Sequence, residues 1–351
     1  MLMAGNDTFA AKETSVVPNG LRELMEGGIL GSVVGDALGV PGEFLSREKL
    51  RAHPITNMRG GGVHGQLPGT WSDDTSMVLA TADSLIHHGI DYEDQMRRFA
   101  EWLWEAKYTA RDEVLDVGGA TRSAIFRYGK GTPAQACGER SEFSCGNGSL
   151  MRILPTALYL VGLNDDVQLD DRTADSIHGT SMCTHAHLRC QMACGIYCAV
   201  VFRLCSKGAL HSAVKEGIDA ALAYYKGNQR FEAVYEDFES LRTVETWPEE
   251  QVESTGYVLH TLQAALWCLL TTEDYASCVL KAVNLGSDTD TTAAVAGGLA
   301  GLWYGEKMIP KAWRAATAKY DEIKAMCHAL YESVTAEYIH SRVEQYPSAE
   351  K

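Results

Sequence analysis

Two acidic segments of the sequence carry the side-chain oxygens that divalent cations bind. They contribute the carboxylates of Asp73 and Asp74, and of Asp288 and Asp290, each pair among Ser and Thr hydroxyls. With no His or Cys at coordinating spacing, this all-oxygen set favours Mg²⁺ or Mn²⁺ over Zn²⁺. Four carboxylates suit two ions better than one. Two such ions can orient a water and a substrate oxygen together, so we expect a hydrolytic reaction.

Helix capping is the simpler interpretation of the first of these segments. Asp and Ser are preferred N-caps, and a cap explains one oxygen-bearing side chain of Ser72-Asp73-Asp74 but not three in succession. Both interpretations stay open for this first segment. The second segment precedes residues 293–301, which are small and apolar and are expected at the buried centre of the fold. Buried carboxylates there need a counter-charge, and neither segment has a Lys or Arg beside it.

Three further segments contain residues that could act in a site. Glu43 follows a small-residue helix that breaks at Pro41-Gly42, where a carboxylate is more often solvated than catalytic. The glycines and short polar side chains of residues 144–152 are typical of an amide-lined phosphate cradle, and equally of an ordinary loop. His185 and His187 form an H-x-H pattern. On a helix over residues 183–205 their side chains would diverge, so we do not expect them to chelate a metal.

Helices must position these residues, because helical periodicity dominates the sequence. Apolar residues repeat along one helix face in segments 78–86, 258–269 and 320–334. Alternation of strand length is nearly absent. The sequence therefore predicts an all-α fold: one compact multi-helix domain over residues 19–351, after a flexible N-terminal arm at residues 1–18. Further helices are predicted near residues 20–39, 92–106, 114–127, 183–205, 210–224 and 273–284, and a long glycine-bent loop, often a functional feature, at 57–69.

The composition is that of a soluble globular protein of 351 residues, with 46% hydrophobic and 22% charged residues. A net charge of -15 repels phosphate backbones and anionic headgroups, so we expect neither nucleic acid nor membrane partners. The N-terminus lacks a basic region followed by an apolar run, and we expect a cytoplasmic protein. The ten cysteines lie in apolar stretches without a CxxC pair and are predicted to be reduced core residues.

In their order along the chain, the motifs resemble those of the ADP-ribosylglycohydrolase family. The resemblance covers about residues 22–335, and the paired SDDT and DTDT motifs are its most specific part. It implies an all-α fold with a central dinuclear metal cleft for two Mg²⁺ or Mn²⁺ ions. It also implies hydrolysis of the glycosidic bond between ADP-ribose and a protein side chain. The motifs are Gly35–Gly39 with Glu43, Gly69–Thr75, Gly146–Arg152, Thr184-His185 and Asp288–Thr291.

The resemblance also implies roles for individual residues. Glu43 matches a glutamate near the scissile ribose, and His185 matches a position near the adenosine end of the substrate. The candidates for proton transfer are Glu43, Asp73 and Asp288, with acid and base not assigned separately. The residues that match the ADP-ribose loop are Ser144, Gly146, Asn147 and Gly148. Those that match the metal ligands are Ser72, Asp73, Asp74, Asp288, Asp290 and Thr291.

The expected function is metal-dependent removal of ADP-ribose from modified protein side chains, with arginine favoured over serine by family analogy. Two alternatives remain open. One is an immunity-type protein that binds an ADP-ribosyltransferase toxin through the N-terminal arm and blocks or reverses its action. The other is a catalytically silent, crystallin-like structural relative, against which the intact acidic motifs argue. The expected partner is an ADP-ribosylated protein, and in the first alternative also the toxin.

Overall fold

The computed structural model describes residues 20–206 and 208–345, so the predicted arm at residues 1–18 lies outside the described residues. Within the described residues, isolated bridges occur but no strand, which confirms the all-α prediction. The helices are α1 (Leu21–Gly39), α2 (Arg47–Ala52), α3 (Asp73–His88), α4 (Tyr92–Glu105), α5 (Gly119–Tyr128), α6 (Leu154–Leu163), α7 (Asp171–Met182), α8 (Leu188–Cys205), α9 (Leu210–Lys226), α10 (Glu232–Tyr235), α11 (Val258–Leu270), α12 (Tyr275–Val283), α13 (Thr289–Tyr304), α14 (Lys311–Ala316) and α15 (Tyr320–Gln345).

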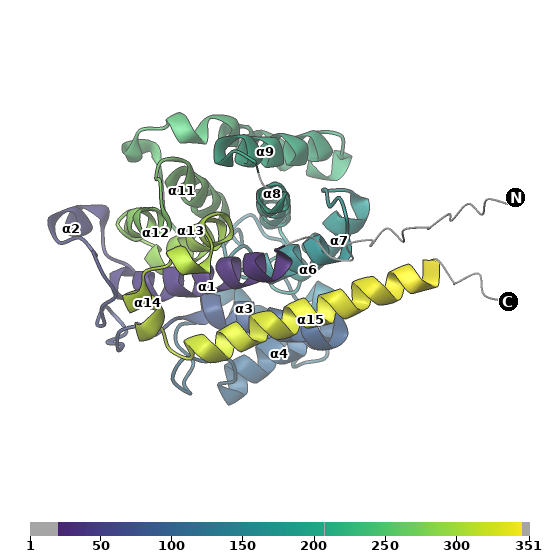
Figure 1. The fold of residues 1–351 in the computed structure, drawn as a ribbon, viewed down its shortest axis with the longest axis horizontal. Coiled ribbons are helices and arrows are strands. Elements are labelled where there is room, and N and C mark those ends of the chain that lie inside the picture. The colour runs from purple at the N-terminus through teal and green to yellow at the C-terminus, as the bar shows by residue number, and fades with distance from the viewer. Residues whose placement is uncertain (1–19, 207, 346–351) are drawn as a thin grey trace, which may run out of the picture.

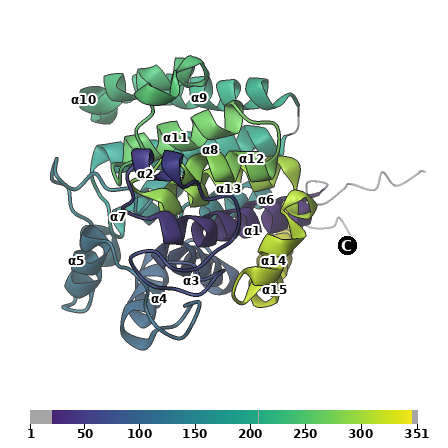
Figure 2. The same cartoon turned by 90° about the vertical axis from the view of Figure 1, so that its left-hand side faces the viewer.

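Helices α1 and α13 lie side by side at the centre of the fold (Figures 1 and 2). Helices α8, α11 and α12 cover one side of this pair, and α3, α4 and α15 cover the other. The residues of α1 and α13 that face each other are small, so the backbones of these two helices approach closely. A Cβ on Gly35 would clash with the Ala293 carbonyl oxygen, and a Cβ on Gly39 would clash with Asp290. The buried position predicted for residues 293–301 is confirmed.

Two predicted helices begin later than the sequence suggested. The segment predicted as one helix over residues 183–205 is a turn followed by α8, with the separate helix α7 before it. His187 is the N-cap of α8 and accepts a hydrogen bond from the Arg189 amide, so the argument that placed His185 and His187 on a helix was wrong. The helix predicted over residues 114–127 begins at Gly119, because Asp116 has a left-handed backbone conformation with a φ of 54°.

Helix α8 is long and apolar enough to cross a membrane by length and composition alone, but 78% of it is buried inside the fold. That burial is expected of a core helix, which passes the same test. Four of the ten cysteines lie on this helix. All ten are unpaired and nine are buried, as the apolar sequence context predicted.

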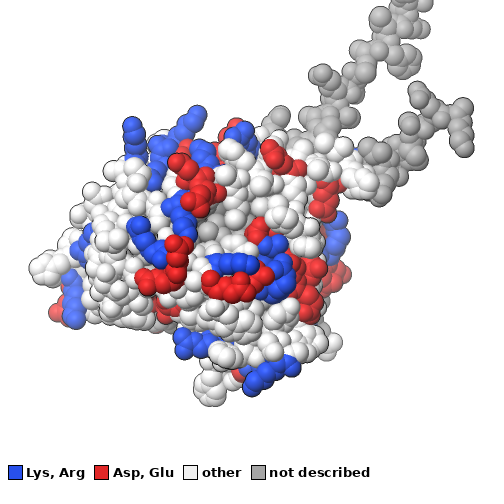
Figure 3. Space-filling model, turned by 90° about the horizontal axis from the view of Figure 1, so that it is seen from below, with Lys and Arg blue, Asp and Glu red and all other residues white. Residues whose placement is uncertain are grey.

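The face formed around α4 and α15 carries charges of both signs side by side (Figure 3). Exposed pairs such as Arg97 with Glu101 on α4, and Arg342 with Asp165, connect them. Mixed surface charge of this kind supports solubility, and each exposed pair adds little to stability.

Candidate metal centre and active site

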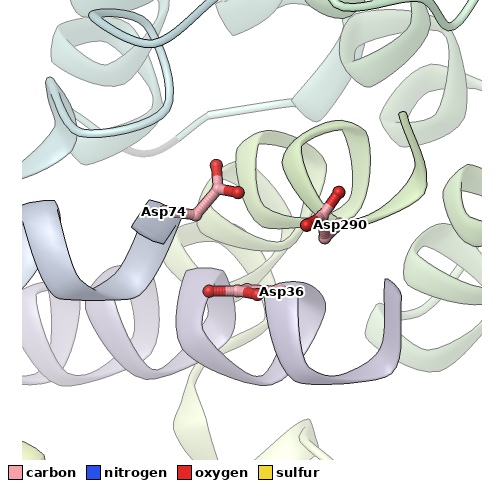
Figure 4. Close-up of side chains that lie close together, drawn as sticks. All are labelled: Asp36, Asp74 and Asp290. Carbon is pink, nitrogen blue, oxygen red and sulfur yellow. The ribbon is translucent and has the colours of Figure 1, made fainter. Parts of the chain in front are cut away.

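Three aspartates from three helices converge at the centre of the fold (Figure 4). Asp36 lies near the end of α1, while Asp74 and Asp290 lie in the first turns of α3 and α13. One carboxylate oxygen from each lies within 4.8 Å of those of the other two, and all three side chains are buried. Asp74 Oδ1 and Asp290 Oδ1 have no hydrogen-bond partner. Because buried carboxylate oxygens need a donor or a cation, this set fits a hard divalent ion.

The hydroxyl groups of the two acidic segments meet at one oxygen of Asp74. Ser72 Oγ donates to Asp74 Oδ2 at 3.1 Å, and Thr291 Oγ1 donates to the same oxygen at 3.2 Å. Ser72 is also the N-cap of α3, so the capping interpretation is confirmed for that residue. At α13, Asp288 occupies the N-cap position but makes no side-chain capping bond. Capping therefore does not account for the second segment.

Asp36 connects the end of α1 to the start of α3. It accepts hydrogen bonds from the Ser72 amide at 3.0 Å, the Thr75 amide at 3.0 Å and the Thr75 hydroxyl at 2.6 Å. Asp36 lies within the predicted motif Gly35–Gly39, but no role was predicted for it. The sequence feature that could have indicated a role is that Asp36 is the one charged residue between Glu26 and Glu43.

A cavity of about 400 Å³ adjoins the aspartate cluster, a volume within the range of small-molecule sites. Asp73 and Asp290, whose convergence the metal hypothesis requires, both line it. Among the described residues that form its walls there is no Lys or Arg. The predicted residues on its walls are Glu43, Asp73, Gly146, Asn147, Gly148, His185, Asp288, Asp290 and Thr291. Ser144 is not among them.

Burial and mutual repulsion hold the carboxyl groups of this cavity and of the aspartate cluster towards their protonated forms. The pKa values of Glu43 and Asp73 are both raised to about 8; burial is the largest cause, and repulsion from Asp116 is the next largest. Burial raises the pKa of Asp36 to about 6, against the lowering effect of its hydrogen bonds. The pKa values of Asp74 and Asp290 are raised well above the ordinary range by burial and by neighbouring carboxylates. A cation would reverse these shifts by favouring the ionised groups.

The loop at Gly146–Gly148 is fixed against both the acidic segment and α11. Asn147 Nδ2 donates to Asp288 Oδ2 at 2.8 Å and to Thr261 Oγ1 at 2.9 Å, and the Asn147 amide donates to the Gly256 carbonyl at 3.0 Å. His185 packs beside Gly148. Burial lowers the pKa of His185 to about 3, so this ring is neutral and can only form a wall or a neutral hydrogen bond.

Asp116 and Phe44 are among the cavity-lining residues to which the sequence assigned no role. Asp116 lies in the loop before α5 and repels Glu43 and Asp73. Because a helix was predicted from residue 114, the sequence did not indicate that Asp116 lies in a loop. Phe44 is 67% exposed, and its φ of 62° is unusual for a bulky residue. A third residue, His64, contacts Glu43 from the glycine-bent loop: its Nε2 lies 2.7 Å from Glu43 Oε2. That loop was predicted to be functional, but no residue in it was singled out.

Comparisons with known proteins agree with this geometry. The family model for ADP-ribosylglycohydrolase matches residues 18–339. The chain is 28% identical to the ADP-ribosylarginine hydrolase Tri1 of Serratia proteamaculans, over 87% of this chain and 78% of that protein. It is 32% identical to the ADP-ribosyl-[dinitrogen reductase] glycohydrolase of Rhodospirillum rubrum, over 82% of this chain and 87% of that protein.

A solved structure has the same fold over almost its whole length. It is described as an ADP-ribosylglycohydrolase-related protein complex, and its chain superimposes with a TM-score of 0.69 at 31% identity, covering 90% of this chain and 99% of its own. The family match extends over the whole cavity and over all three helices that carry the aspartate cluster. The chain therefore belongs to the ADP-ribosylglycohydrolase family.

Proposed function

We propose that this protein hydrolyses the glycosidic bond between ADP-ribose and arginine side chains of modified proteins, with the help of bound divalent cations. The observation that carries the proposal is the buried cluster of Asp36, Asp74 and Asp290 beside a cavity of ligand size. Relatives from Serratia proteamaculans and Pseudomonas putida bear the name ADP-ribosylarginine hydrolase, which supports arginine as the acceptor.

The residues that would hold two Mg²⁺ or Mn²⁺ ions are the predicted ligands together with Asp36. The unpartnered oxygens of Asp74 and Asp290 support this assignment, because the fold leaves them without a protein donor. When bound, such ions supply fixed positive charge and an acidified water. The hydroxyls of Ser72 and Thr291 hold Asp74 in one orientation before any ion arrives.

Side chains on the cavity wall would transfer the protons that the hydrolysis requires. In the hydrolysis, the bond from the anomeric carbon to the arginine nitrogen breaks, a water oxygen bonds to that carbon, and a proton passes to the leaving guanidino group. Glu43, Asp73 and Asp288 line the cavity and are the proton-transfer candidates. Asn147 donates to Asp288 and so fixes the direction of its second oxygen. The groups are in place before the reaction, which lowers its entropic barrier.

The charge of the cavity supports arginine over serine as the acceptor. Five acidic residues line it without a Lys or Arg among the described wall residues. When its carboxyl groups are ionised, the cavity attracts the cationic guanidinium of a modified arginine and gives a neutral O-glycosidic linkage to serine no such advantage. Asp116, which is not a predicted metal ligand, is free to provide part of that attraction.

The test is release of free ADP-ribose from separately prepared arginine-modified and serine-modified proteins. We expect release from the arginine-modified protein, loss of release in excess EDTA, and recovery on addition of Mg²⁺ or Mn²⁺. Asp74→Ala should abolish release, since it removes a cluster carboxylate. Replacement of the exposed Asp321 on α15, Asp321→Asn, should leave the rate of release at the wild-type value. Full activity of Asp74→Ala, or undiminished activity in EDTA, would refute the metal assignment. Release from serine alone would refute the acceptor.

A further inference from the structure

We propose that His64 is a positioning residue that fixes the carboxyl group of Glu43 at the cavity wall. This inference deepens the proposed function and rests on it. His64 Nε2 lies 2.7 Å from Glu43 Oε2, which ties one carboxyl oxygen to the glycine-bent loop. The other oxygen, Oε1, is then the one that can meet a ligand in the cavity.

The backbone around His64 is a tight turn that fixes the ring against the segment before Glu43. Gly61 and Gln66 form an antiparallel bridge, with the Gly61 amide donating to the Gln66 carbonyl at 2.7 Å and the Gln66 amide donating back at 3.2 Å. Gly62 lies at the top of this turn with a φ of 72°, and a Cβ there would come within 2.8 Å of Pro41. The turn is thus pressed against residues that lead directly into Glu43.

Glu43 needs such a partner because its surroundings oppose its charge. Its side chain is 6% exposed, and Asp116, Asp288 and Asp73 all repel it. A carboxylate carries no proton, so when Glu43 is ionised the His64 N–H must be the donor. A hydrogen bond to a charged group is about twice as strong as one between neutral groups. The contact with His64 restricts the carboxyl group to one orientation in either protonation state, and when Glu43 is ionised it also offsets part of the repulsion.

Substitutions in the same turn can separate the positioning of Glu43 from a general effect on the loop. The His64 ring is 21% exposed and meets Glu43 at its inner edge, whereas the neighbouring Val63 is 59% exposed. Val63→Ala is therefore a matched control that alters the same turn without touching Glu43. His64→Gln and His64→Asn form a second matched pair: the glutamine amide reaches as far as Nε2, and the asparagine amide does not.

The experiment measures kcat, KM and Tm on an arginine-modified protein for wild type, His64→Ala, His64→Gln, His64→Asn and Val63→Ala. Removing a side chain that orients a metal ligand typically lowers metal affinity or activity about 10- to 100-fold, and we take the same range for a side chain that orients Glu43. We expect this loss in kcat for His64→Ala and His64→Asn, with KM and Tm little changed. His64→Gln should recover most of the activity, and Val63→Ala should match wild type.

A double-mutant cycle with Glu43→Gln decides whether His64 acts through Glu43. We expect His64→Ala to cause no further loss of kcat in the Glu43→Gln background, because the group that it positions is already altered. Independent losses that add, wild-type kcat in His64→Ala, or a drop confined to KM or Tm would each overturn the inference. A wild-type protein that releases no ADP-ribose would instead overturn the proposed function, so the two failures are distinguishable.

Discussion

Replacing Asp290 by asparagine should stabilise the metal-free protein at pH 8, although it removes a predicted metal ligand. The carboxylate oxygens of Asp36, Asp74 and Asp290 lie within 4.8 Å of one another. At an effective dielectric constant of about 20, two ionised carboxylates at that distance would repel by about 3 kcal/mol, and keeping a proton instead carries a comparable cost at pH 8, where the unfolded chain has released it. Asparagine keeps the shape, removes the charge and adds an amide donor beside Asp36 and Asp74.

The effect should depend on pH in a defined direction. A carboxyl group whose pKa is raised on folding contributes stability below its ordinary pKa of about 4, and that contribution is lost as the pH rises through the folded-state value. The pKa of Asp36 is raised to about 6 and that of Asp73 to about 8. The wild type should therefore lose stability between about pH 4 and pH 8, and the Asp290→Asn variant should lose less.

Thermal unfolding in EDTA measures this difference. An unfolding entropy of about 2.1 cal/mol/K per residue over 351 residues gives about 0.7 kcal/mol/K, so about 3 kcal/mol raises Tm by about 4 °C at pH 8. At pH 5 the gain should shrink. Magnesium at about 1,000 times its Kd should reverse the order, because it adds about 4.1 kcal/mol to the protein that binds it, which exceeds the gain of about 3 kcal/mol in the variant. Asp321→Asn controls for net charge. If Asp290→Asn unfolds earlier than wild type in EDTA at pH 8, the repulsion argument is wrong.

Two further substitutions test the supports of the site. Gly35→Ala places a Cβ against the Ala293 carbonyl oxygen and should destabilise the protein by about 1–3 kcal/mol. Gly208→Ala is the control, because a Cβ there meets open space and should leave Tm unchanged. Equal Tm values for the two variants would contradict the close packing of α1 and α13. Asn147→Ala removes the 2.8 Å bond to Asp288 and should weaken Mg²⁺ binding measured by calorimetry; unchanged affinity would show that Asp288 needs no such support.

The sequence predicted the central helices well because their signals are local. The small residues of α13 predicted its burial, and the Ser and Asp residues before α3 and α13 predicted where both helices begin. Asp36 and Asp116 were missed for different reasons. Asp36 becomes a neighbour of Asp74 and Asp290 only through helix packing between segments far apart in the chain, and Asp116 depends on a left-handed backbone that periodicity does not reveal. The toxin-binding alternative depends on residues 1–18 and stays a prediction.

The way the aspartates are supported implies that the site is formed before any metal binds. Asp36 and Asp290 are set by the contact between α1 and α13, where Gly39 leaves room for Asp290. Asp74 is set by the start of α3, which Asp36 holds through bonds to Ser72 and Thr75. These contacts join protein groups to one another, and they leave one carboxylate oxygen of Asp74 and one of Asp290 unpartnered. The fold therefore brings the carboxylates together through contacts between protein groups, which holds the oxygen donors in place for the divalent ions that we propose.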